Sequence, residues 1–358
     1  MNASTVVRGE RRQRVIGMDV GDRTSVLAVL ERDGTLTEGE VRTTRAAVRA
    51  RFAGEPPTLV VLEVGPHSPW LSRLLRELGH APLVANPSRL PYLTRSGHKT
   101  DRVDAATLAH LARANVELLH PVEHRSEQGQ AELAVIRARN AAVEARTALI
   151  NHIRGAVKAF GERLPACSAP AFARRAGALI PEALRPALEP LLDLVATLTA
   201  QIRGYDGTLA EVAGRHPAVR VLTAIRGVGT LTALAYVLTL EDPHRFRHSR
   251  DVGAFLGLVP RRRQSGARDP ELPITKTGDR ALRRLLVQCA HYILGRHGED
   301  SNLRRWGLRY AGEGSRSRKK KAVVAVARRL AVLLHHLWVT GEVYEPLYGT
   351  DTPATSAA

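Results

Sequence analysis

The spacing of apolar residues changes once along this chain, near Leu133, and the change predicts two kinds of folded unit. Before Leu133, short apolar runs alternate with turn signals, which is typical of strands and short helices. After it, two long stretches step by three and four residues, and each predicts a long helix. The first stretch runs through Leu133, Ile136, Asn140, Val143, Thr147, Ile150, Arg154 and Val157, and the second through Leu191, Leu194, Leu198, Ile202, Tyr205, Leu209 and Val212.

A proline-bearing stretch from Pro165 to Pro190 separates the two predicted helices. The simplest arrangement is therefore an extended helical hairpin or coiled coil. Asn140, Thr147 and Arg154 place polar groups on its seam. They weaken that seam and leave room for either a partner chain or exposure to solvent.

The N-terminal segment predicts a mixed sheet flanked by helices. The runs 14–20 and 24–36 predict adjacent antiparallel strands, with Asp33-Gly34 as a hairpin turn. The run 58–64 predicts a buried strand, 66–79 has helical spacing, and 82–86 predicts another strand. Strands that begin as hairpins and then alternate with helices favour an α/β domain.

The remaining sequence, from about Pro217 to Tyr348, predicts a second globular and mostly helical domain, whose final helix follows the basic run SRSRKKK. We therefore expect an α/β plus α protein. Its predicted parts are an α/β domain over 1–125, a helical spacer over 126–216, a helical domain over 217–348 and a disordered tail over 349–358.

The net charge of +18 and the pI near 10.9 predict a polyanionic partner, with nucleic acid as the first candidate. A solvated basic surface and an anionic-membrane binder are the alternatives, but no apolar run approaches the ~20 residues that span a bilayer. Cys167 and Cys289 are the only cysteines and the N-terminus lacks an apolar signal core, so we expect a cytoplasmic, nucleoid-associated protein. Aromatic residues make up only 4%, which favours contacts to the nucleic-acid backbone over base stacking.

Four carboxylates stand in settings that suggest chemistry. Asp19 lies inside an apolar strand, where an ionised carboxylate is costly unless it is paired or binds metal, and Glu63 ends a second apolar strand. Asp101 and Asp104 share one face of the first turn of a predicted helix that Thr100 can cap. Taken alone, this last pair is equally consistent with two acids that complement the helix dipole.

A sheet-plus-helix domain can bring these four acids together, and hard oxygen ligands of this kind suit Mg²⁺ or Mn²⁺. Two such ions can stabilise both the entering and the leaving oxygen of a phosphodiester exchange. Asp22, just beyond the first strand, is the main rival ligand and is as readily explained as a turn residue.

Three segments, IGMDVG (16–21), VLEVG (61–65) and KTDRVDA (99–105), resemble the ribonuclease H-like, Holliday-resolvase-type (RuvC-like) catalytic domain of the DEDD transposases of bacterial insertion sequences. The resemblance is to the insertion-sequence one-ten family, whose members are described as bridge-RNA-guided recombinases, and it covers nearly the whole chain. It implies that Asp19, Glu63, Asp101 and Asp104 are the four metal-binding acids.

The C-terminal half contains two further motifs. Gly227 and Gly229 lie between two helical stretches, the pattern of a helix-hairpin-helix turn whose backbone amides can hold a phosphate, although a plain interhelical turn has the same pattern. An apolar segment then runs into Arg261, Arg262 and Arg263. Cations in such a loop could stabilise a phosphorane-like transition state, or they could belong to a merely basic, flexible loop.

In the resembling family this loop carries a serine nucleophile that forms a covalent link to DNA, and the matching residue is Ser265. This chain departs from the family pattern after Ser265. Ala267 replaces a second glycine, and the residues RDPELP intervene before the segment that begins at Ile274. Ser249 and Thr275 are rival hydroxyls. The following segment, ITKTGDRALRRLL (274–286), matches the family closely.

Basic residues of the C-terminal half are expected to contact phosphate without reading base sequence, although basic residues on a helix are usually only its solvated face. These are Lys276, Arg280, Arg283 and Arg284, and the later run of Arg316, Arg318, Lys319, Lys320 and Lys321.

The hypothesis from sequence is a transposase that excises and integrates an element through metal-dependent cleavage and a serine–DNA intermediate. The resemblance also implies an oligomer, dimer to tetramer, with active sites completed between protomers, and a structured guide RNA from the flank of the element. The alternatives are a metal-dependent Holliday-junction endonuclease, which needs only the four acids, and a noncatalytic nucleic-acid-binding scaffold.

Overall fold

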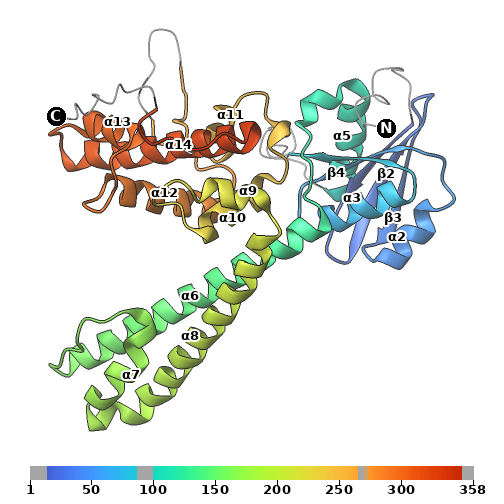
Figure 1. Cartoon of the computed structure of the whole chain (residues 1–358). Helices are drawn as coiled ribbons and strands as arrows, with labels where there is room; N and C mark the ends of the chain where they lie inside the picture. Colours follow the sequence, from blue (N-terminus) through green and yellow to red (C-terminus); the bar gives the residue numbers. More distant parts are fainter. Residues whose placement is uncertain (1–13, 87–99, 265–269, 271, 349–358) are drawn as a thin grey trace. The chain divides into compact units, whose positions relative to one another are not determined.

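The computed structural model describes residues 14–86, 100–264, 270 and 272–348, and the chain forms two compact units, Met1–Arg125 and Ser126–Ala358 (Figure 1). Each unit is described by itself below. The predicted tail over 349–358 lies outside the described residues.

The first unit is built on a five-stranded mixed sheet of order β3-β2-β1-β4-β5. Its strands are β1 (Val15–Asp19), β2 (Thr24–Leu30), β3 (Leu36–Arg42), β4 (Leu59–Glu63) and β5 (Ala81–Ala85). The first three strands are antiparallel neighbours, whereas β1, β4 and β5 run parallel. The predicted mixed sheet is confirmed, and it is compatible with the ribonuclease H-like fold that the resemblance implies.

Helices cover both faces of this sheet because apolar side chains alternate along its strands. One face packs on α2 (Arg45–Phe52) and α3 (Ser68–Glu77), and the other packs on α5 (Asp101–Ala114) and the short helix η2 (Val116–Leu119) (Figure 1). In β1, Ile16 and Met18 face the first pair and Val15 faces the second. Helix α2, which begins after the capping residue Thr44, was not predicted from the sequence.

A close backbone contact joins β1 to α5 at Gly17. A Cβ atom on Gly17 would overlap the carbonyl oxygen of Ala105 and would lie 2.9 Å from the backbone nitrogen of Ala109. The helix backbone therefore rests directly on the strand backbone, which only glycine permits.

We expect Gly17→Ala to push α5 away from the sheet, because overpacking of this kind costs about 1–3 kcal/mol and the obstacle is backbone. The measurement is hydrogen exchange by mass spectrometry on the whole chain, in which the amides of α5 and β1 should exchange faster. Gly39→Ala in β3 is the control, since a Cβ there would meet nothing within 4 Å. Equal protection in both variants would contradict the proposed contact.

The second unit begins with two long helices, α6 (Glu127–Ala159) and α8 (Arg185–Gly214), which pack against each other as a hairpin (Figure 1). Both predicted helices are present, but α8 begins before Pro190, which the prediction placed outside it. Pro186 lies in its first turn, where a missing amide costs nothing, and Pro190 follows one turn later.

Polar side chains of the predicted seam find partners within this hairpin. The Arg154 guanidinium donates to the carbonyl oxygens of Leu164 and Pro165 and lies 5.0 Å from the centre of the Phe172 ring. Thr147 donates to the carbonyl oxygen of Val143 on its own helix. The Arg154 contacts hold the segment that joins the helices, around α7 (Phe172–Ala176), onto α6.

A buried carboxylate ties the start of α6 to the end of α8. Glu132 accepts hydrogen bonds from Arg215 at 2.9 Å and Gln128 at 2.7 Å, and its other oxygen lies 2.7 Å from Nε2 of His216. Burial alone would raise the pKa of Glu132, but these hydrogen bonds outweigh it and hold the pKa below its ordinary value. Glu132 therefore stabilises the fold in its ionised form.

A carboxylate whose pKa is depressed by folding adds stability above its unfolded pKa and loses it as the pH falls through the folded pKa. We expect Glu132→Gln to lower the free energy of unfolding near neutral pH by about 1–3 kcal/mol and to weaken the loss of stability below about pH 5. Urea denaturation of the whole chain across that pH range measures both effects.

The control for this change is Glu144→Gln on the same helix. Glu144 pairs with Arg284 at 2.6 Å on an exposed surface, where a salt bridge contributes about 0–1 kcal/mol. Equal losses in the two variants would contradict the role given to burial.

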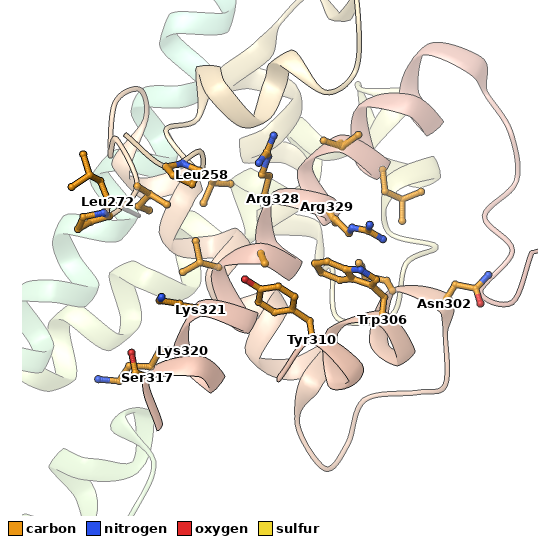
Figure 2. A pocket seen from close by; sticks show the side chains of 18 of the residues that line it. Leu258, Leu272, Asn302, Trp306, Tyr310, Ser317, Lys320, Lys321, Arg328 and Arg329 are labelled. Carbon is orange, nitrogen blue, oxygen red and sulfur yellow. The ribbon is translucent and has the colours of Figure 1, made fainter. Parts of the chain in front are cut away.

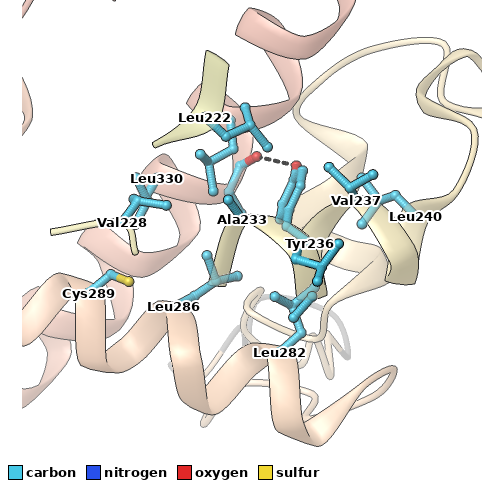
Figure 3. Packing of buried hydrophobic residues seen from close by; sticks show 14 of the residues in the cluster. Leu222, Val228, Ala233, Tyr236, Val237, Leu240, Leu282, Leu286, Cys289 and Leu330 are labelled. Carbon is cyan, nitrogen blue, oxygen red and sulfur yellow. Dashed lines mark hydrogen bonds between the residues drawn. The ribbon is translucent and has the colours of Figure 1, made fainter. Parts of the chain in front are cut away.

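The rest of the second unit is a helical core around Tyr236, whose buried hydroxyl donates to the carbonyl oxygen of Ala331 at 2.7 Å (Figure 3). Burial raises the pKa of Tyr236 well above its ordinary value, so the hydroxyl stays a donor. The helices of this part are α9 (Pro217–Leu222), α10 (Thr230–Leu240), α11 (Asp251–Phe255), α12 (Arg280–Leu294), α13 (Asn302–Ala311) and α14 (Arg316–Thr340).

Helix α14 departs from two expectations. It begins inside the basic run rather than after it, because Ser315 caps it by accepting from the backbone amide of Arg318. It is also long and apolar enough to cross a membrane by length and composition, which the sequence prediction excluded. Nine of its residues, from Ala322 to Leu337, are buried, and most belong to the core around Tyr236, as in a core helix.

Candidate functional site

Asp19 and Glu63 end two neighbouring parallel strands of the first unit. Met18 pairs with Leu62, so the next residue along each strand is one of the two acids. Gly17 and Val61, two residues earlier, lie on the face that α5 covers. Because side chains alternate along a strand, both carboxylates belong to that same face at the carboxyl edge of the strands.

Helix α5 brings its first turn to this edge. Ala105 and Ala109 lie against Gly17, whereas Ala112, further along the helix, belongs to the cluster around Val15 at the start of β1. The helix thus runs from the carboxyl end of β1 towards its amino end.

The first turn of α5 carries the other two acids. The Thr100 hydroxyl caps it by accepting from the amide of Val103 at 3.3 Å. Asp101 is exposed and Asp104 is buried. The first turn of α5, with these two acids, therefore lies at the edge and face of the sheet that carry Asp19 and Glu63, and its N-terminus favours negative charge. Within residues 14–86 and 100–348, apart from 265–269 and 271, no three His, Cys, Asp or Glu side chains gather closely enough to hold a metal ion.

Asp22, the rival ligand, takes part in a hydrogen-bonded chain that sequence reasoning missed. The Trp70 ring N–H donates to Nδ1 of His67 at 3.1 Å, and Nε2 of His67 lies 3.2 Å from a carboxylate oxygen of Asp22. Since Nδ1 accepts, the neutral imidazole carries its proton on Nε2 and donates it to Asp22. Asp22 is thereby linked to the start of α3, while its carboxylate stays 93% exposed.

In the second unit, the loop that contains Ser265 rises from a short paired stem. The backbone amide of Arg261 donates to the carbonyl of Pro273, and that of Thr275 donates to the carbonyl of Val259, both at 2.9 Å. Ser265 itself lies outside the described residues. The stem brings the two ends of its loop together.

Glycines lock the base of this stem. A Cβ on Gly257 would overlap the backbone of Thr277, and one on Gly278 would overlap the carbonyl oxygen of Phe255. Both glycines also have positive φ, at 66° and 71°. The Arg283 guanidinium donates to the carbonyls of Leu256 at 3.0 Å and Thr277 at 2.7 Å, so it joins the two strands of the stem.

We expect Arg283→Gln to loosen the stem without unfolding α12. The two carbonyl groups lose their hydrogen bonds from a charged donor, and each such bond contributes about 1.5–3 kcal/mol. Hydrogen exchange should rise at residues 256–259 and 275–278. Arg280→Gln, an exposed neighbour on the same helix, is the control and should leave those amides protected. Loss of protection along all of α12 would contradict a local role.

The two rival hydroxyls, on Ser249 and Thr275, lie within the described residues. The Ser249 hydroxyl lies 2.9 Å from Nδ1 of His335, whose Nε2 lies 2.8 Å from the carbonyl oxygen of Pro243. A carbonyl only accepts, so Nε2 carries a proton, and Nδ1 of the neutral ring accepts from Ser249. The Thr275 hydroxyl lies 3.1 Å from that of Thr277. Ser249 thus has a histidine partner that sequence reasoning missed.

The predicted phosphate contacts lie on several surfaces of the second unit. Gly227 has a φ of 95° in the turn between α9 and α10, and Gly229 caps α10. Arg284 pairs with Glu144. The exposed basic residues among them are Arg261, Arg262, Arg263, Lys276, Arg280, Arg284, Arg316, Arg318, Lys319, Lys320 and Lys321. Their contact with nucleic acid stays a prediction.

Comparison with known proteins places the chain among transposases. Residues 16–161 match a model of DEDD transposases, and residues 219–305 match a model described as the transposase IS116/IS110/IS902 family. The chain is 30% identical over 338 residues to the transposase for insertion sequence element IS1328 of Yersinia enterocolitica, covering 92% of this chain and 98% of that protein.

Two further relatives agree. A probable family 20 transposase of Pseudomonas aeruginosa is 32% identical over 79% of this chain and 84% of its own length. The transposase for insertion sequence element IS1111A of Coxiella burnetii is 29% identical over 92% of this chain and 91% of its own. The fold and the matches define a DNA transposase of the DEDD class. The chain belongs to the IS116/IS110/IS902 family of transposases.

Proposed function

We propose that this transposase excises and integrates an insertion sequence by metal-dependent strand cleavage and by rejoining through a covalent serine–DNA intermediate. The observation that carries the proposal is the convergence of Asp19, Glu63 and the first turn of α5 on one edge and face of the sheet. The match of two family models, one over residues 16–161 and the other over residues 219–305, supports it.

In this proposal Asp19, Glu63, Asp101 and Asp104 hold Mg²⁺ or Mn²⁺. Their oxygen donors suit these hard cations, and the adjacent helix N-terminus favours negative charge. When bound, the metal would supply positive charge that stabilises negative charge developing on a phosphodiester. To hold a metal ion together, the four acids have to come closer to one another than they are in the structure.

The serine step is an exchange of phosphate esters. The Ser265 hydroxyl attacks the scissile phosphorus and gives up its proton as the new Oγ–P bond forms, and the bond to the leaving DNA oxygen breaks as that oxygen takes up a proton. A hydroxyl of the recipient strand later attacks the same phosphorus and restores the serine. The exposed Arg261, Arg262 and Arg263 at the end of the stem would stabilise the charge of both transition states.

The partners proposed are the DNA ends of the element, its target DNA and a guide RNA from the element's flank. We further propose a dimer or tetramer in the cytoplasm, on the nucleoid, with α6 and α8 as a coiled-coil spacer up to residue 216 and the Gly227 turn as a helix-hairpin-helix contact to phosphate. The charge of +18 supports the nucleic-acid partners.

The test incubates the protein with Mg²⁺ and DNA that carries the element's ends, and then looks for protein joined to DNA after denaturation. We expect the native chain to form an adduct and Ser265→Ala to form none. Ser249→Ala and Thr275→Val, which remove the rival hydroxyls, should retain it. Asp19→Asn should abolish both cleavage and adduct, with a loss of at least about a hundredfold, typical of an essential catalytic group.

The other outcomes separate the alternatives. Cleavage without any adduct, unaffected by Ser265→Ala, would identify a junction endonuclease that hydrolyses DNA. An adduct lost only in Ser249→Ala would move the nucleophile to the Ser249–His335 pair. If every variant still binds DNA and the native chain does not cleave it, the protein is a noncatalytic nucleic-acid-binding scaffold.

A further inference from the structure

A cavity of about 1130 Å³ in the second unit has no part in the function proposed so far. Its walls are α13, α14 and the stem of the Ser265 loop, which contributes Leu258, Pro260 and Ile274 (Figure 2). Most of its surface is apolar, yet it opens beside a strongly basic helix. A cavity of this size holds a ligand as large as a nucleotide.

An ordered aromatic pair lies on one wall of the cavity. Trp306 and Tyr310, one turn apart on α13, are stacked with ring centres 5.5 Å apart and planes 20° from parallel. The Arg329 guanidinium of α14 lies 3.7 Å from the centre of the Trp306 ring. These contacts hold Trp306 in place, and Figure 2 shows the Tyr310 ring directed into the cavity. Tyr310 is 41% exposed, so its ring is available to a ligand.

The charge of the wall has a single sign. Among the described residues that line the cavity, four are cationic, namely Lys320, Lys321, Arg328 and Arg329, and none is a carboxylate. All four come from α14, whose N-terminal dipole adds further positive potential beside Lys320 and Lys321. An aromatic ring next to a row of cations matches a nucleobase joined to its phosphates.

We propose that this cavity holds an unstacked base of a DNA single strand, with the base stacked on Tyr310 and the flanking phosphates on Lys320 and Arg328. A duplex keeps its bases stacked inside and cannot fill an apolar cavity in this way. We assign the strand as DNA because the cavity borders the stem of the loop that carries Ser265, the proposed nucleophile toward DNA. The proposal therefore rests on the proposed function. Strands being exchanged have to leave their duplex, and the cavity would hold one of them.

Binding of fluorescent oligonucleotides to the whole chain, in the presence of EDTA, tests the proposal. The probes are oligo-dT, the same length of oligo-U and a DNA duplex. Tyr310→Ala should weaken oligo-dT binding about tenfold, within the range for one base stacked on an aromatic ring, and leave duplex binding unchanged. Tyr310→Phe keeps the ring and should bind as the native chain does.

Leu308→Ala is the matched control, because Leu308 lies on the same helix, is 44% exposed and does not line the cavity. A second measurement needs no variant. Oligo-dT in which abasic sites replace the bases should bind the native protein about tenfold more weakly than intact oligo-dT, as expected from the loss of one stacked base.

Several results would overturn the proposal. These are an equal loss in Leu308→Ala and Tyr310→Ala, no loss with the abasic probe, or a larger effect of Tyr310→Ala on oligo-U than on oligo-dT, which would assign the cavity to RNA. A changed oligomeric state of Tyr310→Ala in sedimentation velocity would assign it to a second copy of the chain. Because EDTA removes metal and no strand is cut, failure here is separate from failure of the adduct test.

Discussion

The direct backbone contact between α5 and β1 at Gly17 determines where the acids of the first unit lie. A side chain at this position would separate the helix from the strand, and the first turn of α5 would move away from the end of β1. Asp101 and Asp104 would then no longer share an edge with Asp19 and Glu63. Gly17 is therefore a packing requirement, and the position of Asp19 relative to the acids of α5 depends on it.

The second unit uses the same device for its loop. Gly257 and Gly278 let the backbones of 255–258 and 276–278 approach closely, and Arg283 joins their carbonyls. A loop whose two ends are held in this way can present residues at its tip without contributing to the hydrophobic core. In both units, a glycine lets two backbones touch. This contact fixes the place of an element that carries residues of the proposed chemistry.

Sequence reasoning succeeded where the signal is local. The alternation in β1 and β4 and the three-and-four spacing of α6 and α8 each lie within one element, so the sheet and both long helices could be predicted. It failed where partners are distant. Asp22 meets His67 across 45 positions, Glu132 meets His216 across 84, and Ser249 meets His335 across 86. No local pattern marks such pairs, which form only once the core has packed. The sequence predicted that Asp19 and Glu63 lie at one edge of the sheet, because the end of each strand is marked by nearby residues. The pairing register between β1 and β4 could not be predicted in this way.

Composition averaged over the chain also concealed the cavity beside α14. An aromatic content of 4% favours backbone contacts to nucleic acid, yet a stacking site needs only one ring in the right place. Trp306 and Tyr310, four residues apart on a helix, have the spacing of an ordinary packing stripe, and Trp306 does pack against the core. What distinguishes Tyr310 is that α14 crosses beside it and lines the same cavity with cations as well as with apolar residues. A basic run that the sequence presents as a solvated surface thus becomes one wall of an aromatic cavity, because the helix begins inside that run.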